Sequence, residues 1–186
     1  LFLDEAPEYP RANLETLRQP LEDHKVTITR SNGRATFPAD FMLVATMNPC
    51  PCGYYGDPRK ECTCSPMQIS SYQQRLSGPL LDRIDLKIHV SRVDNTKIIQ
   101  RDSSSDIQHR EAQKSISSAR NKQLNRYKSS TIYNSNLTNR HLKQHVAMTP
   151  QADTFLEAAA KKLDISARSL FKIIKVARTV ADIDGI

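Results

Sequence analysis

The first five residues, Leu1-Phe2-Leu3-Asp4-Glu5, constrain the fold more than any other stretch of the chain. Three apolar residues with the composition of a buried strand run directly into two adjacent carboxylates. Charge at the end of a buried strand is costly unless a cation lies opposite it. The stretch therefore predicts a strand that delivers Asp4 and Glu5 to a metal site, although a strand that ends in Asp-Glu at a surface turn is also common.

A second apolar run, residues 41–45, predicts another strand that is buried on both faces. It leads into Thr46-Met47-Asn48, so a polar side chain again follows the end of a strand. Ligands bind at the C-terminal edge of open parallel sheets. Asn48 is therefore expected at the same edge as Asp4 and Glu5.

Between the two predicted strands, Pro10 suits the first turn of a short amphipathic helix. Leu14, Leu17 and Leu21 lie on one face of this helix, and Pro20 is expected to bend or end it.

A hairpin is expected next, because residues 26–30 alternate apolar and polar side chains and residues 35–37 resume after an Asn-Gly turn. Arg30 and Arg34 flank the predicted tip. These arginines either contact phosphates or keep an exposed hairpin soluble.

The remaining segments predict an α/β part, residues 1–94, followed by an all-α part, residues 95–186. In the first part a helix is expected around residues 70–76, a break at Gly78-Pro79 and one more strand over residues 86–90. In the second part a polar loop is expected over residues 129–136. Helical periods occupy residues 112–119, 155–163 and 170–181, with capping residues expected within 103–105, at Thr138 or Asn139, at Ser166 and at Gly185.

Charge is divided unevenly between the two parts. Residues 1–94 hold 11 Lys and Arg against 12 Asp and Glu, whereas residues 95–186 hold 16 against 8. The basic second part favours an anionic partner such as nucleic acid or nucleotide, although a solvated basic helix face accounts equally for any single residue. No apolar run reaches the length of a membrane span, so no membrane partner is expected.

The four cysteines form two pairs, Cys50-x-Cys52 and Cys62-x-Cys64, separated by nine residues. Two such pairs in extended backbone can converge on one ion, so the pattern favours a structural zinc site. Its spacing departs from the usual C-x-x-C knuckle. Disulfides and free buried thiols are the alternatives.

Six motifs of the chain are Leu3-Asp4-Glu5, Leu17-Arg18-Gln19-Pro20-Leu21-Glu22, Met47-Asn48-Pro49-Cys50-Pro51-Cys52-Gly53-Tyr54, Ser77-Gly78-Pro79-Leu80-Leu81-Asp82-Arg83-Ile84-Asp85, Ser166-Ala167-Arg168 and Val176-Ala177-Arg178-Thr179. Together they resemble the Mg-chelatase-like AAA+ ATPases of the ComM/YifB type. The resemblance spans nearly the whole chain. It implies a bacterial cytoplasmic motor that forms a hexameric ring and uses ATP to move branched DNA, with a parallel-sheet core, a presensor hairpin and a C-terminal helical lid.

The resemblance also implies roles for individual residues. Asp4 is similar to the Walker B aspartate that organises Mg²⁺, and Glu5 to the base that accepts a proton from the attacking water. Asn48 looks like the sensor 1 amide. Without the other motifs, the simpler interpretation of Asn48 would be an Asn in a turn before proline. Arg83 resembles the arginine finger that reaches a neighbouring subunit's site, and Arg168 resembles sensor 2.

Two of these roles have ordinary alternatives. Arg83 can form an ion pair with Asp82 or Asp85, which is worth little when exposed. Arg168 lies in the first turn of a helix, where the macrodipole disfavours a cation unless an anion such as phosphate binds there. The alternative is a solvent-exposed arginine that the helix dipole hardly affects. In the same family frame, Arg30 and Arg34 occupy the position of an arm that enters the pore of the ring.

No phosphate-cradling loop can be made from this chain, because none of its five glycines precedes a lysine. A truncated AAA+ core is therefore expected: the P-loop should lie upstream in a longer protein, and these residues alone should not hydrolyse ATP.

The alternative function is a non-enzymatic helix-turn-helix DNA-binding module with a zinc-stapled loop. Its helices would be residues 155–163 and a reader helix that starts at Ser166. The reader helix would present Lys172, Lys175 and Arg178 to DNA.

Overall fold

The computed structural model describes residues 1–31, 33–90 and 104–186 and divides the chain into two compact units, Leu1–Arg92 and Val93–Ile186. The boundary predicted between residues 94 and 95 lies outside the described residues. Within the described ranges, no helix combines the length and the apolar character that crossing a bilayer requires.

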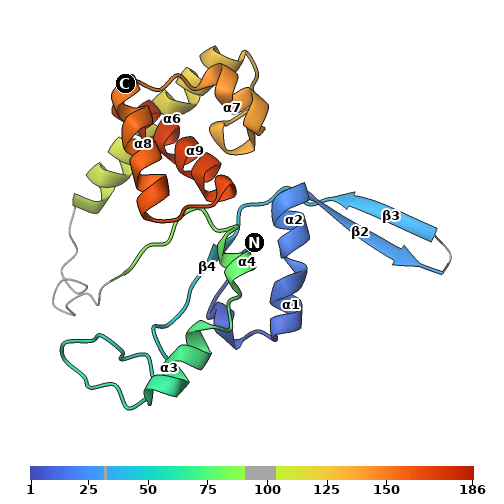
Figure 1. Ribbon diagram of the computed structural model, residues 1–186, viewed down its shortest axis with the longest axis vertical. Coiled ribbons are helices and arrows are strands. Elements are labelled where there is room, and N and C mark those ends of the chain that lie inside the picture. Colours follow the sequence, from blue (N-terminus) through green and yellow to red (C-terminus); the bar gives the residue numbers. More distant parts are fainter. Residues whose placement is uncertain (32, 91–103) are drawn as a thin grey trace. The chain divides into compact units, whose positions relative to one another are not determined.

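The first unit contains a two-stranded parallel sheet of β1 (Phe2–Leu3) and β4 (Val44–Ala45) (Figure 1). The Val44 N–H donates to the Leu1 carbonyl over 2.9 Å, and the Thr46 N–H to the Leu3 carbonyl over 2.9 Å. The predicted strand pair is thus confirmed, but its predicted burial is wrong. Phe2 is 62% exposed and Val44 is 44% exposed, because no third strand in the described part of the chain flanks this pair.

Three short helices follow β1: η1 (Ala6–Glu8), α1 (Arg11–Thr16) and α2 (Arg18–Asp23). The predicted single helix is divided at Leu17 and not at Pro20. Proline is tolerated in the first turn of a helix but clashes with the carbonyl four residues earlier, so Pro20 fits within α2 and the break precedes it. The leucines of both helices contribute to the core of this unit, which consists of Ala6, Leu14, Leu76 and Leu80 with Leu3, Leu17, Leu21 and Leu81 packed against it.

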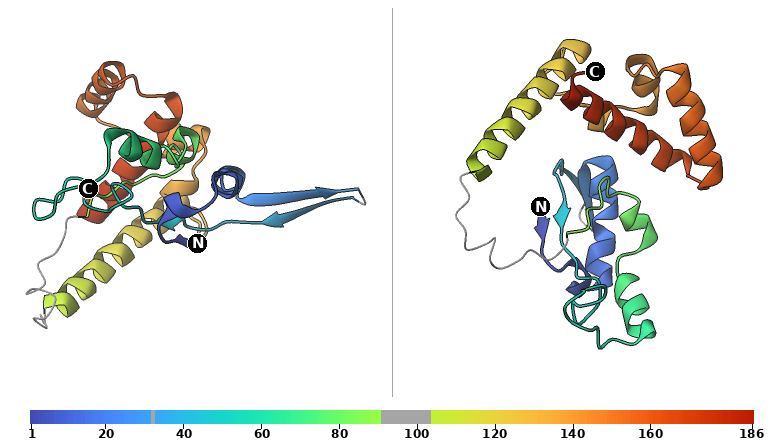
Figure 2. Two further views of the ribbon diagram at one scale, coloured as in Figure 1. Left: turned by 90° about the horizontal axis from the view of Figure 1, so that it is seen from below. Right: turned by 90° about the vertical axis from the view of Figure 1, so that its left-hand side faces the viewer.

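The hairpin is confirmed: β2 (Lys25–Arg30) and β3 (Gly33–Pro38) are antiparallel, with Arg30 opposite Gly33 at the tip (Figure 2). Gly33 has a φ of 145°, which L side chains rarely adopt. Eleven of the twelve strand residues are exposed, so the hairpin is an arm whose faces are not packed within its unit.

Two short helices close the first unit, α3 (Pro66–Gln73) and α4 (Gly78–Leu81). Helix α3 starts earlier than predicted because Ser65 and Gln68 form a reciprocal capping box. Ser77 caps α4, so the expected break at Gly78-Pro79 is instead a helix start. The strand predicted over residues 86–90 is wrong: this segment is irregular, since its backbone pairs with no other described strand.

The described part of the second unit is helical, as predicted. Thr138 caps α7, and α9 starts after Ser166 and ends before Gly185, which has a φ of 90°. Helix α9 packs against α6, η2 and α7. The elements are α6 (Ser104–Tyr127), η2 (Asn134–Asn136), α7 (Asn139–His145), α8 (Pro150–Lys162) and α9 (Ala167–Asp184).

A buried ionic cluster joins these helices. The Asp182 carboxylate, 0% exposed, accepts hydrogen bonds from both guanidinium arms of Arg126 and, over 2.9 Å, from Nη2 of Arg178. Asn134 Nδ2 donates to Asp182 Oδ2 over 2.9 Å, and the Tyr127 hydroxyl donates to Asn134 Oδ1 over 2.5 Å. Although burial alone would raise the pKa of Asp182, the hydrogen bonds of Arg126 and Asn134 outweigh it and lower the pKa to about 2.

Candidate functional site

The C-terminal edge of the β1–β4 pair brings together side chains from two distant segments, as predicted. Asp4 and Glu5 follow β1, whereas Thr46 and Asn48 follow β4. The Thr46 hydroxyl donates to Asp4 Oδ1 over 2.6 Å and accepts from the Glu5 N–H over 2.9 Å. Asn48 Nδ2 donates to Glu5 Oε1 over 3.5 Å, which is long for a hydrogen bond.

Glu5 has an unusual backbone conformation. Its φ of 50° and ψ of 50° place it in the left-handed region, which side chains other than glycine seldom occupy. The chain then turns into η1, and the Ala6 N–H donates to the Thr46 carbonyl over 2.8 Å. Such strain persists only where surrounding contacts hold it, and it is concentrated at functional sites.

Helix α3 and the residues after it support this edge. Gln73 Nε2 donates to the Pro49 carbonyl over 3.0 Å, beside Asn48. Arg75 Nη1 donates to the Pro7 carbonyl over 3.0 Å and to Glu8 over 3.1 Å. The loop after β1 and the loop after β4 are therefore both held by residues of α3 or of the segment directly after it.

Tyr72, also in α3, is almost fully buried. Burial raises the pKa of its hydroxyl, and the negative charges of Glu8 and Glu5 add to this rise.

Sequence reasoning missed Thr46 and the α3 residues Tyr72 and Gln73. Thr46 had a readable signal, since it is the first polar residue after a predicted strand. Tyr72 and Gln73 had none, because a tyrosine or glutamine in a polar helix reads as surface.

Arg83 lies just after α4 and is held by contacts within the first unit. Its Nε donates to the Arg18 carbonyl over 3.0 Å, its Nη1 to the Pro79 carbonyl over 2.7 Å, and its Nη2 pairs with Glu22. Arg83 therefore forms its ion pair with Glu22, and not with Asp82 or Asp85 as the alternative expected. The side chain is 12% exposed and lines a surface hollow beside α2 and β2.

The four cysteines converge, and none of the four forms a disulfide. The Sγ atoms of Cys50 and Cys52 are 3.4 Å apart, those of Cys50 and Cys62 3.6 Å, and those of Cys52 and Cys62 3.5 Å. Cys64 completes a group whose ligand atoms all lie within 4.8 Å of one another. A tetrahedral ion with bonds of about 2.3 Å to sulfur needs ligands about 3.8 Å apart, so the group can hold a metal ion.

The pKa values in this cluster diverge. A hydrogen bond from the backbone of Tyr54 is the main cause that lowers the pKa of Cys52 to about 5. A backbone hydrogen bond from Cys64 lowers the pKa of Cys62, but burial and its contacts with Cys52 and Cys50 outweigh it and raise the pKa to about 12. Without a metal, one thiolate in the cluster therefore disfavours deprotonation of its neighbours. A bound dication would compensate the repulsion between several thiolates.

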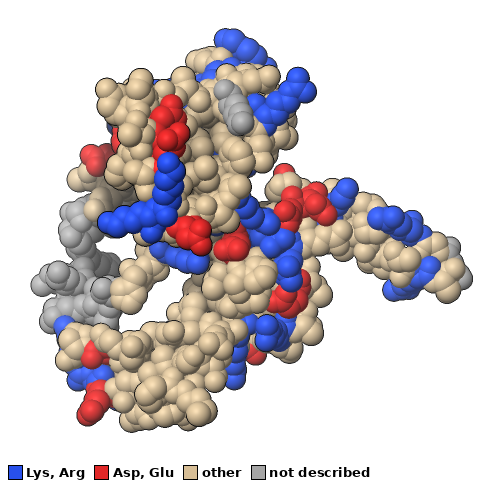
Figure 3. All heavy atoms as spheres, viewed as in Figure 1, with Lys and Arg blue, Asp and Glu red and all other residues tan. Residues whose placement is uncertain are grey.

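The hairpin carries Arg34 opposite Thr29 and Arg30 at the last position of β2. Both arginines are exposed, and Figure 3 shows Lys and Arg side chains on the projecting hairpin. Alternate residues of a strand share a face, so Arg30 extends the apolar face of Val26 and Ile28. Direct partners in a strand pair also share a face, so Arg34 lies on the same face as Thr29, which is the other face.

Arg168 is the second residue of α9, and its side chain is exposed. Two of the three basic residues that the helix-turn-helix alternative assigns to DNA are engaged inside the second unit. Lys175 Nζ donates to the Ser135 carbonyl over 2.9 Å, and Arg178 belongs to the buried ionic cluster. The structure therefore disfavours α9 as a reader helix.

Comparison with known proteins supports the family resemblance. Residues 1–98 match the model of the family described as magnesium chelatase, subunit ChlI, and residues 104–186 match the model of the ChlI C-terminal region. Competence protein ComM of Haemophilus influenzae is 38% identical over 185 residues, covering 100% of this chain, and uncharacterized protein YifB of Escherichia coli is 35% identical over 188 residues, covering 99%. The chain spans 35% of the length of each relative. It belongs to the magnesium chelatase ChlI family and is similar throughout to ComM and YifB.

Proposed function

We propose that this chain supplies the catalytic carboxylates and the helical lid of a cytoplasmic, ring-forming AAA+ ATPase that acts on DNA, as a helicase or branch-migration motor. One observation carries the proposal: Asp4, Glu5, Thr46 and Asn48 meet at one strand edge in a hydrogen-bonded arrangement. The family match supports ATP and Mg²⁺ as cofactors.

The donors at this edge fit Mg²⁺, which prefers carboxylate oxygens and retains water ligands. Asp4 gives one oxygen to Thr46, which orients the carboxylate for the ion. Bound Mg²⁺ would neutralise charge on the nucleotide phosphates. Glu5 would accept a proton from the attacking water, and the amide of Asn48 would orient that carboxylate.

Arg83 and Arg168 would supply positive charge at the phosphates. Arg83 would act on the nucleotide of a neighbouring subunit, as an arginine finger in a hexameric ring. Its contacts with Glu22 and two carbonyls would fix the guanidinium before a partner arrives. Arg168 would bind phosphate at the start of α9.

The decisive experiment is Glu5→Gln in the longer protein that carries this chain. Loss of the general base should lower kcat for ATP hydrolysis by about 100-fold or more while nucleotide affinity is retained. Glu157→Gln, at an exposed position of α8, is the control and should leave kcat within about twofold. Unchanged hydrolysis in Glu5→Gln would overturn the proposal.

The 186 residues alone should not hydrolyse ATP, because none of their glycines precedes a lysine that could contact the phosphates. ATPase activity of the isolated chain that disappears in Glu5→Gln would contradict this expectation.

We also assign the cysteine cluster a structural zinc ion. Its place directly after Asn48-Pro49 would let the metal fix the loop that carries Asn48. Natively purified protein should contain about one zinc per chain, and Cys64→Ser should reduce that content and lower Tm. Metal analysis that finds no zinc in the native protein would end the assignment.

The hairpin is the proposed DNA-contacting arm of the ring. Replacing Arg30 and Arg34 with Ala should weaken DNA binding or unwinding by the longer protein, and most strongly at low salt. Lys87→Ala with Arg59→Ala removes the same charge from elsewhere in the first unit and serves as the control. Unchanged DNA affinity and unwinding in the hairpin variant would exclude the role.

A further inference from the structure

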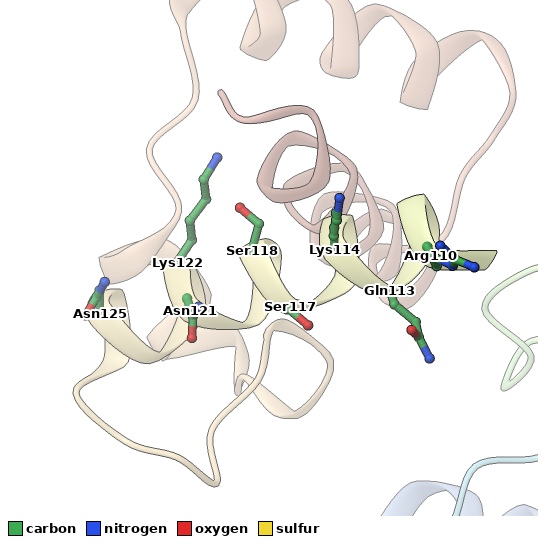
Figure 4. Close-up of a pocket in the computed structure, with 8 residues that line it drawn as sticks. All are labelled: Arg110, Gln113, Lys114, Ser117, Ser118, Asn121, Lys122 and Asn125. Atoms are coloured by element: carbon green, nitrogen blue, oxygen red, sulfur yellow. The ribbon is translucent and has the colours of Figure 1, made fainter. Parts of the chain in front are cut away.

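Helix α6 carries a polar stripe along one face, around a shallow surface hollow. Figure 4 shows Lys114, Ser118 and Lys122 pointing to one side of the helix and Gln113, Ser117 and Asn121 to the other. Seven of the eight stripe residues are exposed and Lys122 is half-buried. The stripe consists of Arg110, Gln113, Lys114, Ser117, Ser118, Asn121, Lys122 and Asn125.

The three cations of the stripe are Arg110, Lys114 and Lys122. In the part of the chain that the structure describes, none of them forms an ion pair. The acidic residues of α6 are Asp106 and Glu111, which lie near its N-terminal end and outside the stripe. From Lys114 onward, α6 carries no carboxylate of its own, so this part of the helix has a net positive charge.

The other arginines of the helix behave differently. Arg126 pairs with Asp182, and Arg120 Nη2 donates to the Tyr133 hydroxyl over 3.2 Å. These contacts stabilise the second unit. Among the described residues, Arg110 and Lys114 form no ion pair of this kind, so folding alone does not account for these two; Lys122 Nζ lies beside Gly185 at the C-terminal end of α9.

We infer that the α6 stripe contacts the sugar-phosphate backbone of a DNA strand; the inference rests on the proposed DNA-directed function and adds a second contact surface to it. Lys114, Ser118 and Lys122 are one helical turn apart, so their row is about 12 Å long. Because a strand rises about 3.4 Å per nucleotide, this row spans three to four phosphates.

The remaining stripe residues fit the same partner. The amides of Gln113 and Asn121 and the hydroxyl of Ser117 can donate to phosphate and sugar oxygens. Contacts of this kind carry no base information, so binding would be independent of sequence. Cations and hydroxyls that repeat at each turn of one helix favour the regularly spaced phosphates of a nucleic acid over an acidic protein surface.

The test is DNA binding by the longer protein with Arg110→Gln, Lys114→Gln and Lys122→Gln combined. Glutamine keeps helix propensity while it removes charge. Fluorescence anisotropy with duplexes of two unrelated sequences should show weaker binding to both. The slope of log affinity against log salt should fall by up to about 3.

The matched control removes three charges elsewhere in the second unit: Arg140→Gln, Lys161→Gln and Lys162→Gln, all at exposed positions. This control should keep the wild-type slope. Equal slopes in the two triple variants would overturn the inference. So would loss of binding to anionic lipid vesicles with unchanged DNA binding.

The outcome is separable from the proposed function. If the wild type shows DNA-stimulated ATPase activity and the stripe variant retains both that stimulation and the salt slope, the inference fails and the motor function stands. If the wild type binds no DNA at low salt, the DNA role and the inference fail together, whereas the Glu5→Gln result still decides the ATPase.

Discussion

The strand-edge site of the first unit and the buried ionic cluster of the second both combine carboxylates with hydrogen-bond donors, but in opposite environments. Asp182 is fully buried and its charge is balanced by Arg126 and Arg178. Asp4 and Glu5 are exposed, and their protein partners are the neutral groups of Thr46 and Asn48. Balanced charge in the interior joins helices, whereas unbalanced charge at an open edge is suited to a cation.

The largest expected effect comes from Asp182→Asn. Loss of the carboxylate leaves two guanidinium groups without a counter-charge, which should cost about 3–5 kcal/mol in the free energy of unfolding of the second unit. Asp184→Asn, at an exposed position two residues on, is the control and should change it by less than about 0.5 kcal/mol. Urea unfolding followed by circular dichroism measures both. Similar values for the two variants would contradict a structural role for the cluster.

The same cluster predicts a pH dependence. Because the folded-state pKa of Asp182 is lowered to about 2, its stabilisation is complete above the unfolded value near 4 and is lost as pH falls from about 4 toward 2. The second unit should lose about 2 kcal/mol over that interval. Urea titrations at several pH values should show the loss in the wild type. A loss of the same size in Asp182→Asn would mean that another group titrates.

At the exposed site a single hydroxyl should affect activity more than folding. Thr46→Val removes the donor to Asp4 and the acceptor for the Glu5 N–H. In the longer protein we expect kcat for ATP hydrolysis to fall about tenfold, with KM little changed, because the carboxylates lose their orientation. Thr46→Ser keeps the hydroxyl and should restore the rate. If the serine variant is as slow as the valine variant, lost packing is the cause.

The smallest expected effect is that of Glu22→Gln. Glu22 is 45% exposed, so its pair with Arg83 should stabilise the first unit by less than about 1 kcal/mol. Thermal unfolding measures the stability cost of Glu22→Gln, which can then be compared with that of Asp182→Asn in the buried cluster. Asp23→Asn is the neighbouring control. A cost as large as that of Asp182→Asn would show that exposure does not distinguish the two ion pairs.

The sequence was sufficient for features that depend on local chemistry. The Asn-Gly turn predicted the hairpin, Ser166 and Gly185 marked the ends of α9, and two strand ends predicted that Asp4 and Asn48 would lie at one edge. Each follows from backbone preference or strand direction. The roles of Arg83, Arg168 and the hairpin arginines in hydrolysis and DNA binding stay predictions.

Features that depend on distant partners could not be predicted. Residues 86–90 have a strand-like pattern, but a strand also requires a neighbour that pairs with its backbone, and the apolar pattern says nothing about that neighbour. Asn134 lies in a segment read as a polar loop, yet it is buried because Asp182, Thr179 and Tyr127 meet it there. Composition favours exposure for such a residue, and only tertiary contact reverses it.

The narrow β1–β4 pair has a practical consequence for anyone who purifies this chain by itself. Among the described residues no third strand flanks these two short strands, whose Phe2 and Val44 are exposed, and open sheet edges of this kind recruit further strands. Preparations should therefore form concentration-dependent oligomers, more readily at high ionic strength, where the net charge of +7 repels less. Dilute samples in low salt are the conditions in which solution measurements on the chain should be most readily interpreted.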